Sequence, residues 1–413
     1  MRVLLLLTAQ TYRAPAFIAA AERLGIDAVQ AIDMPEQLTD YWNYALGINY
    51  SDRAAAIRSI VEFAAKHPLD AILAVDDSGS ILATHASAAL DLPHNAVAAA
   101  EAARNKHRMR ELLQQGGVPV PTFRLCSTTD DLGSLAAQIT YPCVVKPLDL
   151  NGSRGVIRAD APAQFVAAAQ RLAVLLTSID PTPGPKPFLI ERFIPGCEVA
   201  LEGLLDHGRL HVLALFDKPD PLDGPFFEET IYVTPSRLPI DVQEAIASCT
   251  AAAAAAIGLR AGPIHAELRI NEHGPWIVEI AGRSIGGLCA KTLRFGANVS
   301  LEELILRQAC GLPIDSFGRE QQARGVMMIP IPGEGVLRNV TGLEEALAVP
   351  GIEEIDLTAK LNYPLVPLPE GDSYLGFIFA RGETPEEAER ALRRAYQRLH
   401  FTVLPSIPLS LKQ

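Results

Sequence analysis

Two acidic residues in consecutive apolar stretches have the types and spacing to bind a metal ion. Glu267 lies in His-Ala-Glu-Leu-Arg-Ile, and Glu279 lies in Trp-Ile-Val-Glu-Ile. If both stretches are antiparallel strands joined at 271–275, the two acids come close on one face. Buried like charges are costly unless a cation neutralises them, and oxygen ligands favour Mg²⁺ or Mn²⁺. The pair predicts a metal site of the kind that carries nucleotide phosphates; two exposed acids on an edge strand are the alternative.

A lysine and a glycine-rich loop upstream have the chemistry to hold phosphate. Lys146 ends the apolar run Val-Val-Lys-Pro, and Asn-Gly-Ser-Arg-Gly follows at 151–155. A lysine projecting from a rigid strand binds a phosphate as a point charge. The loop offers backbone N–H groups and the guanidinium of Arg154 to fold over a polyphosphate. For the loop considered alone, a surface hairpin turn is the alternative.

The segment from Phe188 to Glu198 has the pattern of a strand that runs into a hinge. Its apolar start leads to Glu191, then to a bend with Pro195 and Gly196, and then to the second acid. Such a hinge offers backbone groups to the edge of a flat heterocycle and a carboxylate to a sugar diol. An ordinary hairpin has the same pattern, so this hypothesis depends on the lysine, loop and acids around it.

Strands and helices alternate at the start of the chain. Strands are predicted at 2–7, 26–32 and 70–75, and helices at 16–24 and 54–66. Such alternation indicates a parallel sheet with helices on both faces, whose ligands gather at the carboxyl ends of the strands. The residues after the first and third strands are therefore expected to line a crevice. No G-x-G-x-x-G follows the first strand, so a dinucleotide site there is unsupported.

The middle of the chain predicts two helices, a hairpin and one long loop. One helix is predicted over 101–115 and another, rich in alanine, over 241–257. The stretches 199–205 and 210–216 are expected to pair as a hairpin. The loop 217–230 is long and contains two adjacent phenylalanines. Loops of this length are usually disordered or functional, and the phenylalanines favour an ordered, functional loop.

A smaller strand-rich unit is predicted from 324 to 403. It contains a hairpin candidate over 325–337 and a long amphipathic helix over 384–399. The start of that helix, Thr-Pro-Glu-Glu, has a capping residue, a proline in the first turn and two acids at the positive end of the helix dipole. A chain of 413 residues is too long for one core, so two or three domains are expected.

The composition restricts the class of protein. With 49% apolar residues, 20% charged residues and a net charge of −12, the chain reads as soluble and globular, without a nucleic-acid surface. No apolar run approaches the length that spans a bilayer, so no membrane partner is expected. The apolar start is predicted to be a buried strand rather than a signal peptide. Six scattered cysteines indicate neither zinc nor disulfides, which suits a reducing cytoplasm.

Taken in order, these motifs resemble the ATP-grasp superfamily, and the resemblance covers essentially the whole chain. It implies a fold that combines α/β and α+β parts. A Rossmann-like parallel sheet domain would occupy 1–95, and a two-lobed ATP-binding domain 96–320, with its lid-bearing lobe at about 118–190. A small α+β domain would occupy 321–413. The expected ligands are ATP and Mg²⁺ or Mn²⁺.

The resemblance also implies a role for each residue of the series. It assigns Lys106 and Lys146 to the phosphates, with Lys146 also catalytic; Gly152, Ser153, Arg154, Gly155 and Val156 to a mobile lid; Glu191, Phe193 and Ile194 to adenine; Glu198 to the ribose; Glu267 and Glu279 to the metal; and Arg283 to the reacting centre.

One departure from the family pattern indicates which branch of the superfamily the chain resembles. Many members have Asn two residues after the second metal-binding Glu, whereas this chain has Ala281 in Glu-Ile-Ala-Gly-Arg. That variant, together with the loop 217–230, is similar to the L-amino-acid ligase branch, which forms dipeptides. A second metal ion would then be held less fully, or by a bridging Glu279. No biotin- or carrier-binding signal is present, which disfavours a carboxylase.

The resemblance implies that a carboxylate attacks the γ-phosphate and that the acyl phosphate then meets an amine. Candidates for binding the substrates are Lys218, Glu228, Glu229, Arg283 and Arg294. The expected partners are small molecules, an acid and an amine, with a homodimer suggested by the family alone. Two alternatives stay open: a carboxylase- or phosphoribosyl-type synthetase, and a nucleotide sensor without turnover.

Overall fold

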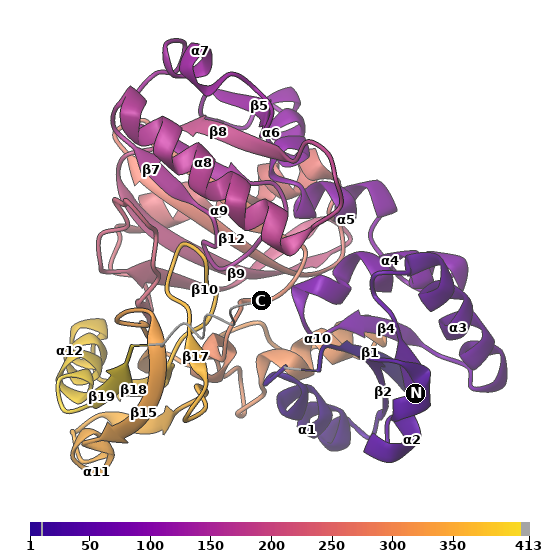
Figure 1. Cartoon of the computed structure of the whole chain (residues 1–413). Helices are drawn as coiled ribbons and strands as arrows, with labels where there is room; N and C mark the ends of the chain where they lie inside the picture. Colours follow the sequence, from indigo (N-terminus) through magenta and orange to yellow (C-terminus); the bar gives the residue numbers. More distant parts are fainter. Residues whose placement is uncertain (10, 406–413) are drawn as a thin grey trace.

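The fold was obtained as a computed structural model, which describes residues 1–9 and 11–405. Three parts are visible in Figure 1: the N-terminal sheet in indigo, an upper pair of lobes in magenta and pink, and the C-terminal part in orange and yellow. The predicted combination of a parallel N-terminal sheet, a two-lobed middle part and a small C-terminal part is confirmed. Their exact boundaries stay a prediction.

The N-terminal sheet is parallel, as its alternating strands and helices predict. Its order is β3-β2-β1-β4, with β1 at Arg2–Leu7, β2 at Asp27–Asp33, β3 at Leu46–Ile48 and β4 at Ala71–Ala74. Alternate side chains of β1 enter cores on opposite faces, with Leu5 on one and Leu4 on the other. The helices here are α1 (Ala14–Leu24), α2 (Thr39–Trp42), α3 (Arg53–Lys66) and α4 (Ser80–Ala89).

The upper lobe is a four-stranded antiparallel sheet covered by one long helix. Its order is β5-β8-β6-β7, with β5 at Phe123–Ser127, β6 at Cys143–Pro147, β7 at Ile157–Ala159 and β8 at Pro187–Arg192. Helix α8 (Pro162–Ile179) lies across this sheet in Figure 1, and α7 (Leu132–Ala136) lies at its tip. Phe165 and Leu172 of α8 are fully buried against the sheet, which fixes the base of the loop 151–156.

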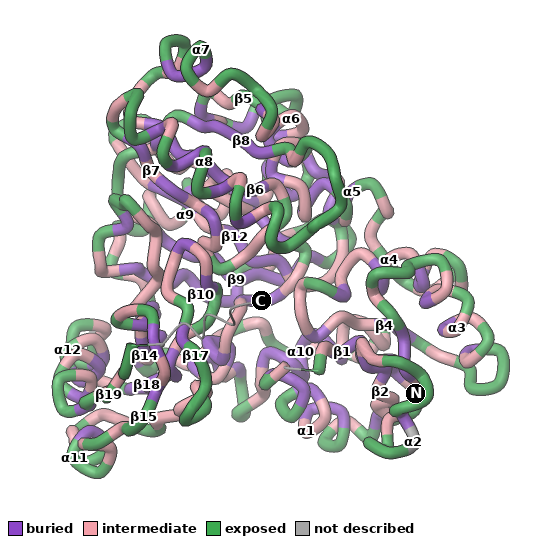
Figure 2. The backbone as a smooth tube through the Cα atoms, viewed as in Figure 1, coloured by how far each residue is buried: buried purple, intermediate pink, exposed green. Residues whose placement is uncertain are grey.

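An eight-stranded antiparallel sheet forms the centre of the molecule, and its strands are among the most buried parts in Figure 2. Its order is β13-β12-β9-β10-β11-β14-β18-β16. The bounds are β9 Cys197–Asp206, β10 Arg209–Lys218, β11 Ile231–Thr234, β12 Gly262–Asn271, β13 Gly274–Ala281, β14 Ala323–Ile329, β16 Ile352–Asp356 and β18 Gly376–Gly382. The predicted hairpin at 199–216 is confirmed as β9–β10.

Helix α9 (Ile240–Ile257) is long and apolar enough to cross a membrane by composition alone. One face of it, including Ile246, Thr250 and Ala253, is buried in the core that contains strands β12 and β13. The Cα of Gly116 lies so close to α9 that an added Cβ would come within 2.5 Å of the Ala256 Cβ. The alanines of α9 therefore allow α6 (Lys106–Gln115) and α9 to pack closely in the core.

The expected hairpin at 325–337 is wrong. Strand β14 joins the central sheet between β11 and β18, whereas β15 (Gly335–Thr341) belongs to a separate sheet, β17-β15-β19. Strands β17 (Pro364–Leu365) and β19 (His400–Leu404) complete that sheet. Helix α12 (Pro385–Tyr396) packs against β14 and β18 of the central sheet, and α11 (Leu343–Leu347) packs against β16. A turn is a local preference, whereas a strand's partners depend on which core buries it.

The helix expected over 101–115 is two helices. Helix α5 (Val97–Arg104) ends at Asn105, and α6 (Lys106–Gln115) begins directly after it. Asn105 has an extended backbone, and its side-chain oxygen accepts from the Arg108 N–H, which is an N-cap within an apparently continuous helical pattern. The break places Lys106 in the first turn of a new helix, where the Lys106 N–H donates to the Leu148 carbonyl. Helix α10 spans Leu301–Ala309.

Candidate active site

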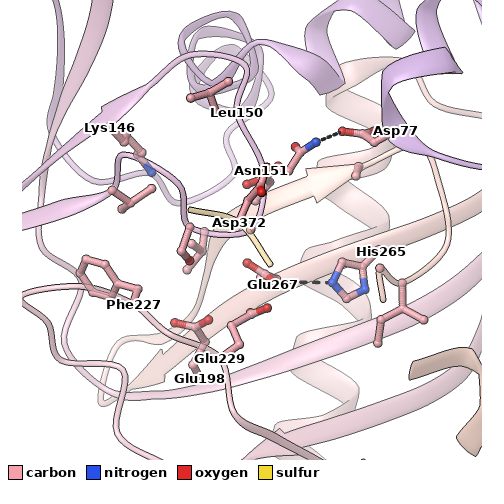
Figure 3. A pocket seen from close by; sticks show the side chains of 18 of the residues that line it. Asp77, Lys146, Leu150, Asn151, Glu198, Phe227, Glu229, His265, Glu267 and Asp372 are labelled. Carbon is pink, nitrogen blue, oxygen red and sulfur yellow. Dashed lines mark hydrogen bonds and ion pairs between the residues drawn. The ribbon is translucent and has the colours of Figure 1, made fainter. Parts of the chain in front are cut away.

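A cavity of about 310 Å³ lies where the three parts of the molecule meet. The loops after β1 and β4, helix α6, strands β6, β8, β12 and β13, and the segment around Tyr374 all contribute to its wall. Figure 3 shows Lys146 on one side of the cavity and a group of three acids on another. The predicted residues that line it are Lys106, Lys146, Gly152, Ser153, Val156, Glu191, Phe193, Ile194, Glu198, Glu229, Glu267, Glu279 and Arg283.

Five predicted site residues do not border this cavity. Lys218 lies behind the wall, where it contacts three of the lining acids. Arg154 and Gly155 contact the segment 369–372 instead. Arg294 donates to the carbonyl of Leu293, and Glu228 is half-buried away from the wall.

Lys146 and Glu191 form a buried charge cluster with Arg110, a residue that the sequence did not single out. The Lys146 Nζ lies 2.5 Å from Glu191 Oε2, and the Arg110 Nε donates to Glu191 Oε1 at 2.6 Å. Burial alone would raise the pKa of Glu191, but the two cations outweigh it and lower that pKa to about 2. Arg110 follows Lys106 by one helical turn, and that spacing was the available signal.

Burial also lowers the pKa of Lys146, and Arg110 and Lys106 add to the effect, while Glu191 opposes it. Beyond the cluster, the Arg110 Nη2 donates to the Val278 carbonyl at 2.7 Å. The Arg110 Nη1 is buried without a hydrogen-bond partner among the described residues. Three charges held this way fix the ammonium of Lys146 at the cavity wall, where it can meet a phosphate.

Lys106 ties the start of α6 to two other parts of the site. Its Nζ donates to the Leu150 carbonyl at 2.7 Å and lies 3.3 Å from Glu279 Oε2. The side chain is buried. The contact with Leu150 joins the lysine to the beginning of the loop 151–156, so a ligand that engages Lys106 also reaches this loop.

The two acids expected to bind metal lie opposite each other. Glu267 of β12 and Glu279 of β13 are register partners across the antiparallel pair, as the sequence pattern predicts, and a bulge follows Glu267. Both line the cavity, and both present carboxylate oxygens, which are the donors that suit Mg²⁺. The residues present therefore fit such an ion, while Ala281 supplies no side-chain ligand.

A second group of acids surrounds Lys218. Oxygens of Glu198, Glu229 and Glu267 lie within 4.8 Å of one another, and Figure 3 shows the three carboxylates together. The Lys218 Nζ contacts all three, at 2.8 Å for Glu198 and 3.1 Å for Glu267. Burial and the neighbouring Glu267 raise the pKa of Glu229 to about 7, although Lys218 opposes the shift. The Lys218 ammonium holds the three acids together as a metal ion would.

A buried histidine, together with Glu202, links this group of acids to the backbone at Ile285. The His265 Nδ1 lies 3.2 Å from Glu202 Oε2, and its Nε2 lies 3.6 Å from Glu267 Oε1. The Glu202 carboxylate also accepts from the Ile285 N–H at 3.0 Å. Burial alone would lower the pKa of His265, but the two acids raise it. The histidine thus orients Glu267.

The hinge after β8 is held by arginines. The guanidinium groups of Arg158 and Arg269 lie over the Phe193 ring, at 4.2 and 4.7 Å from its centroid, and the ring stacks against Phe227 at 6.3 Å. Arg269 also donates to the Ile194 carbonyl at 2.7 Å and to Glu198 Oε2 at 3.0 Å. The hinge carbonyl is therefore already paired within the protein.

Arg283 lies at the edge of the N-terminal sheet. Its Nε is 3.3 Å from Oδ1 of Asp77, which follows β4, as the crevice prediction anticipated. Asp77 also accepts from Asn151 Nδ2 at 2.6 Å, drawn as a dashed line in Figure 3, and pairs with Arg104. This network connects Arg283 to Asn151, the first residue of the loop 151–156.

Three family models match successive parts of the chain. They are the ATP-grasp N-terminal domain at residues 18–94, the ATP-grasp domain at 139–292, and the L-amino acid ligase C-terminal domain 2 at 327–404. The chain is 26% identical to alanine–anticapsin ligase of Bacillus subtilis over 64% of this chain and 57% of that protein. It is 27% identical to dapdiamide A synthase of Enterobacter agglomerans over 70% of this chain and 71% of the synthase.

Among solved structures, that of an L-amino acid ligase from Bacillus licheniformis superposes with a TM-score of 0.80 at 26% identity. The superposition covers 98% of this chain and 99% of the ligase. By contrast, the match spans less than two thirds of the length of alanine–anticapsin ligase. The fold, the three successive family matches and this likeness show that the chain belongs to the ATP-grasp superfamily, in its L-amino acid ligase-like branch.

Proposed function

We propose that the protein is an ATP-dependent ligase that joins the carboxyl group of one amino acid, or a related acid, to the amine of another. The observation that carries the proposal is the opposition of Glu267 and Glu279 in one cavity with the buried Lys106 and Lys146. Such a set suits transfer of the γ-phosphoryl group to a carboxylate, because positioning and charge neutralisation dominate that reaction.

The residues of the cavity have proposed roles that follow from their positions. Lys106 and Lys146 hold the phosphates, and Glu191 and Arg110 keep the Lys146 ammonium in place. Glu267 and Glu279 would hold Mg²⁺, which when bound neutralises charge on the phosphates. Arg283 faces the charge that develops as the carboxylate is activated, and Asp77 orients its guanidinium. Gly152, Ser153 and Val156 cover the phosphates and exclude water, while Phe193, Ile194 and Glu198 hold the nucleoside.

The remaining assignments follow from this proposal. Lys218 and Glu229 shape the acidic side of the substrate site, and ATP as the phosphate donor suits a cytoplasmic enzyme. A homodimer is proposed on family grounds alone. A carboxylase-type reaction is disfavoured, because the C-terminal region matches an amino acid ligase model.

The test is release of ADP and phosphate from Mg²⁺-ATP with single amino acids and all their pairs. Glu279→Gln is expected to lower turnover at least about 100-fold, because it removes one of the two carboxylates that would hold Mg²⁺. The matched control is Glu272→Gln, an exposed acid in the turn of the same hairpin, which should behave as wild type. The proposal would be contradicted if wild type released no more ADP and phosphate than Glu279→Gln with any pair of acid and amine.

A further inference from the structure

Arg13 is a buried cation without an anionic partner among the described residues. Its side chain is on the cavity wall and is 7% exposed. Of the four other arginines on the wall, three are paired, Arg110 with Glu191, Arg269 with Glu198 and Arg283 with Asp77, and the fourth, Arg192, is exposed to solvent. Arg13 instead donates from Nη1 to the Val75 carbonyl at 2.9 Å and from Nη2 to Ser284 Oγ at 2.6 Å.

These contacts orient the guanidinium without neutralising it. The Arg13 group lies over the Phe17 ring at 5.9 Å, and its two acceptors are neutral. A guanidinium has five N–H donors, so several remain for a ligand. Burying a charge without a counter-ion is costly, and a bound carboxylate would offset that cost with two parallel hydrogen bonds. Arg13 therefore has the properties of an anchor for a carboxylate.

Asp76 is a neighbouring anion that lacks a cationic partner among the described residues. It accepts from the hydroxyls of Thr8 and Thr11 at 3.0 and 2.9 Å, and it lines the same cavity. No lysine, arginine or histidine pairs with it in the described part of the chain. The Val75 carbonyl that holds Arg13 is the preceding residue, so the two charges are neighbours that do not pair with each other. A ligand with both charges would match them.

We propose that Arg13 and Asp76 bind the zwitterionic amino acid that supplies the amine, with its carboxylate on Arg13 and its ammonium group on Asp76. This inference rests on the proposed ligase function. The carboxylate of the amine donor persists in the product, so a permanent cationic partner suits it. The carboxylate of the other substrate reacts and must instead lie near the phosphates, Glu279 and Arg283. The amine donor is therefore a free amino acid rather than a simple amine or an amino acid amide.

The test compares L-alanine, L-leucine and L-phenylalanine with their amides as amine donors. Wild type should prefer the free acid at least about 30-fold, since a charge-assisted pair contributes this much. Arg13→Gln should raise the KM for the free acid about 30-fold and leave the KM for the amide and for ATP unchanged. Asp76→Asn should raise the KM for both forms. Arg23→Gln, in helix α1, which begins directly after Arg13, and with an exposed side chain, is the matched control and should change nothing.

Calorimetry with the same compounds and a non-hydrolysable ATP analogue separates this inference from the ligase reaction. Free amino acids should bind to wild type and lose at least about 30-fold in affinity in Arg13→Gln, whether or not any pair is turned over. If Arg13→Gln does not fold, Ser284→Ala, which frees one Nη of Arg13, should weaken binding of the free acid several-fold and spare the amide. The inference is overturned if the amides bind as tightly as the acids, if no compound binds, or if Arg13→Gln impairs only the activated acid.

Discussion

At Glu191 one carboxylate neutralises two buried cations, Lys146 and Arg110. All three side chains are within the protein, and the acid touches no other charged group of the site. Removing one member of such a cluster leaves the others as uncompensated buried charges, which costs more than the cluster as a whole contributes. The geometry of Lys146 therefore depends on an acid that need not touch the substrate.

Glu191→Gln should lower the free energy of unfolding by about 3–5 kcal/mol and raise the KM for ATP, because Lys146 loses its partner. Urea unfolding and steady-state kinetics measure the two effects. The control is Glu111→Gln, since Glu111 pairs with Arg108 at the surface and its removal should leave the free energy of unfolding near that of wild type. An unfolding midpoint equal to wild type would contradict the buried pairing.

The same carboxylate predicts a pH dependence. Its pKa is lowered from 4.5 to about 2 in the folded chain, because Arg110 and Lys146 outweigh the effect of burial. A lowered folded-state pKa stabilises the protein above the unfolded value, and that stability is lost as the pH falls from about 4.5 towards 2. Glu191→Gln should therefore show a shallower loss of stability than wild type across this window.

Among the elements, the junction of α5 and α6 has the most direct effect on the site. The Asn105 side chain caps α6, and the next residue is Lys106. An N-cap fixes where a helix starts and hence the direction of the first side chains after it. The position of the Lys106 ammonium, 3.3 Å from Glu279, is thus set by a residue outside the cavity wall.

Asn105→Ala should destabilise the protein by about 1 kcal/mol and raise the KM for ATP several-fold, because the first turn of α6 loosens. Asn105→Asp, which retains a capping oxygen, should restore both properties to near wild type. Thermal unfolding and ATP kinetics provide the readouts. An alanine variant that loses stability while keeping its KM would mean that the cap does not position Lys106.

Across the whole molecule, the loop 151–156 of the upper lobe contacts the C-terminal part. The Gly155 N–H donates to the Pro369 carbonyl at 2.8 Å, and the Arg154 Nε donates to the Glu370 carbonyl at 2.7 Å. From α8, Arg171 binds the Glu370 carboxylate with two hydrogen bonds, at 2.5 and 2.8 Å. The cover of the cavity is therefore fastened by a segment more than two hundred residues downstream.

Glu370→Ala should increase ATP hydrolysis without amide formation about two- to fivefold. Without the Arg171–Glu370 pair, the loop 151–156 would be held less firmly over the cavity, so that water reaches the acyl phosphate more often. The effect is modest because Arg171 and Glu370 are both exposed, and such pairs contribute at most about 1 kcal/mol. The ratio of ADP to amide product measures it. Glu345→Ala, on the exposed side of α11, is the control, and an unchanged ratio in Glu370→Ala would exclude a latch.

The sequence by itself determined the fold class and predicted the chemistry of the proposed site. The period of apolar residues identified β1, β4, α9 and most other elements, because burial on one face or both leaves a local pattern. The spacing of Glu267 and Glu279 about a turn also sufficed to place them opposite each other. These features depend on residues close in the chain, so the local pattern contained them.

Only the tertiary structure decided which charges are partners. Arg110 meets Glu191 across 81 residues, and Arg13 meets Ser284 across 271. It also sent β14 and β15 to different sheets, against the local turn signal. The free-energy cost of a charge depends on how far it is buried and on its counter-ion. Both are provided by segments that are distant in the sequence and that folding brings together. The sequence therefore indicated the groups that we propose bind phosphate and metal, whereas the unpaired state of Arg13 and Asp76 among the described residues emerged only from the packed chain.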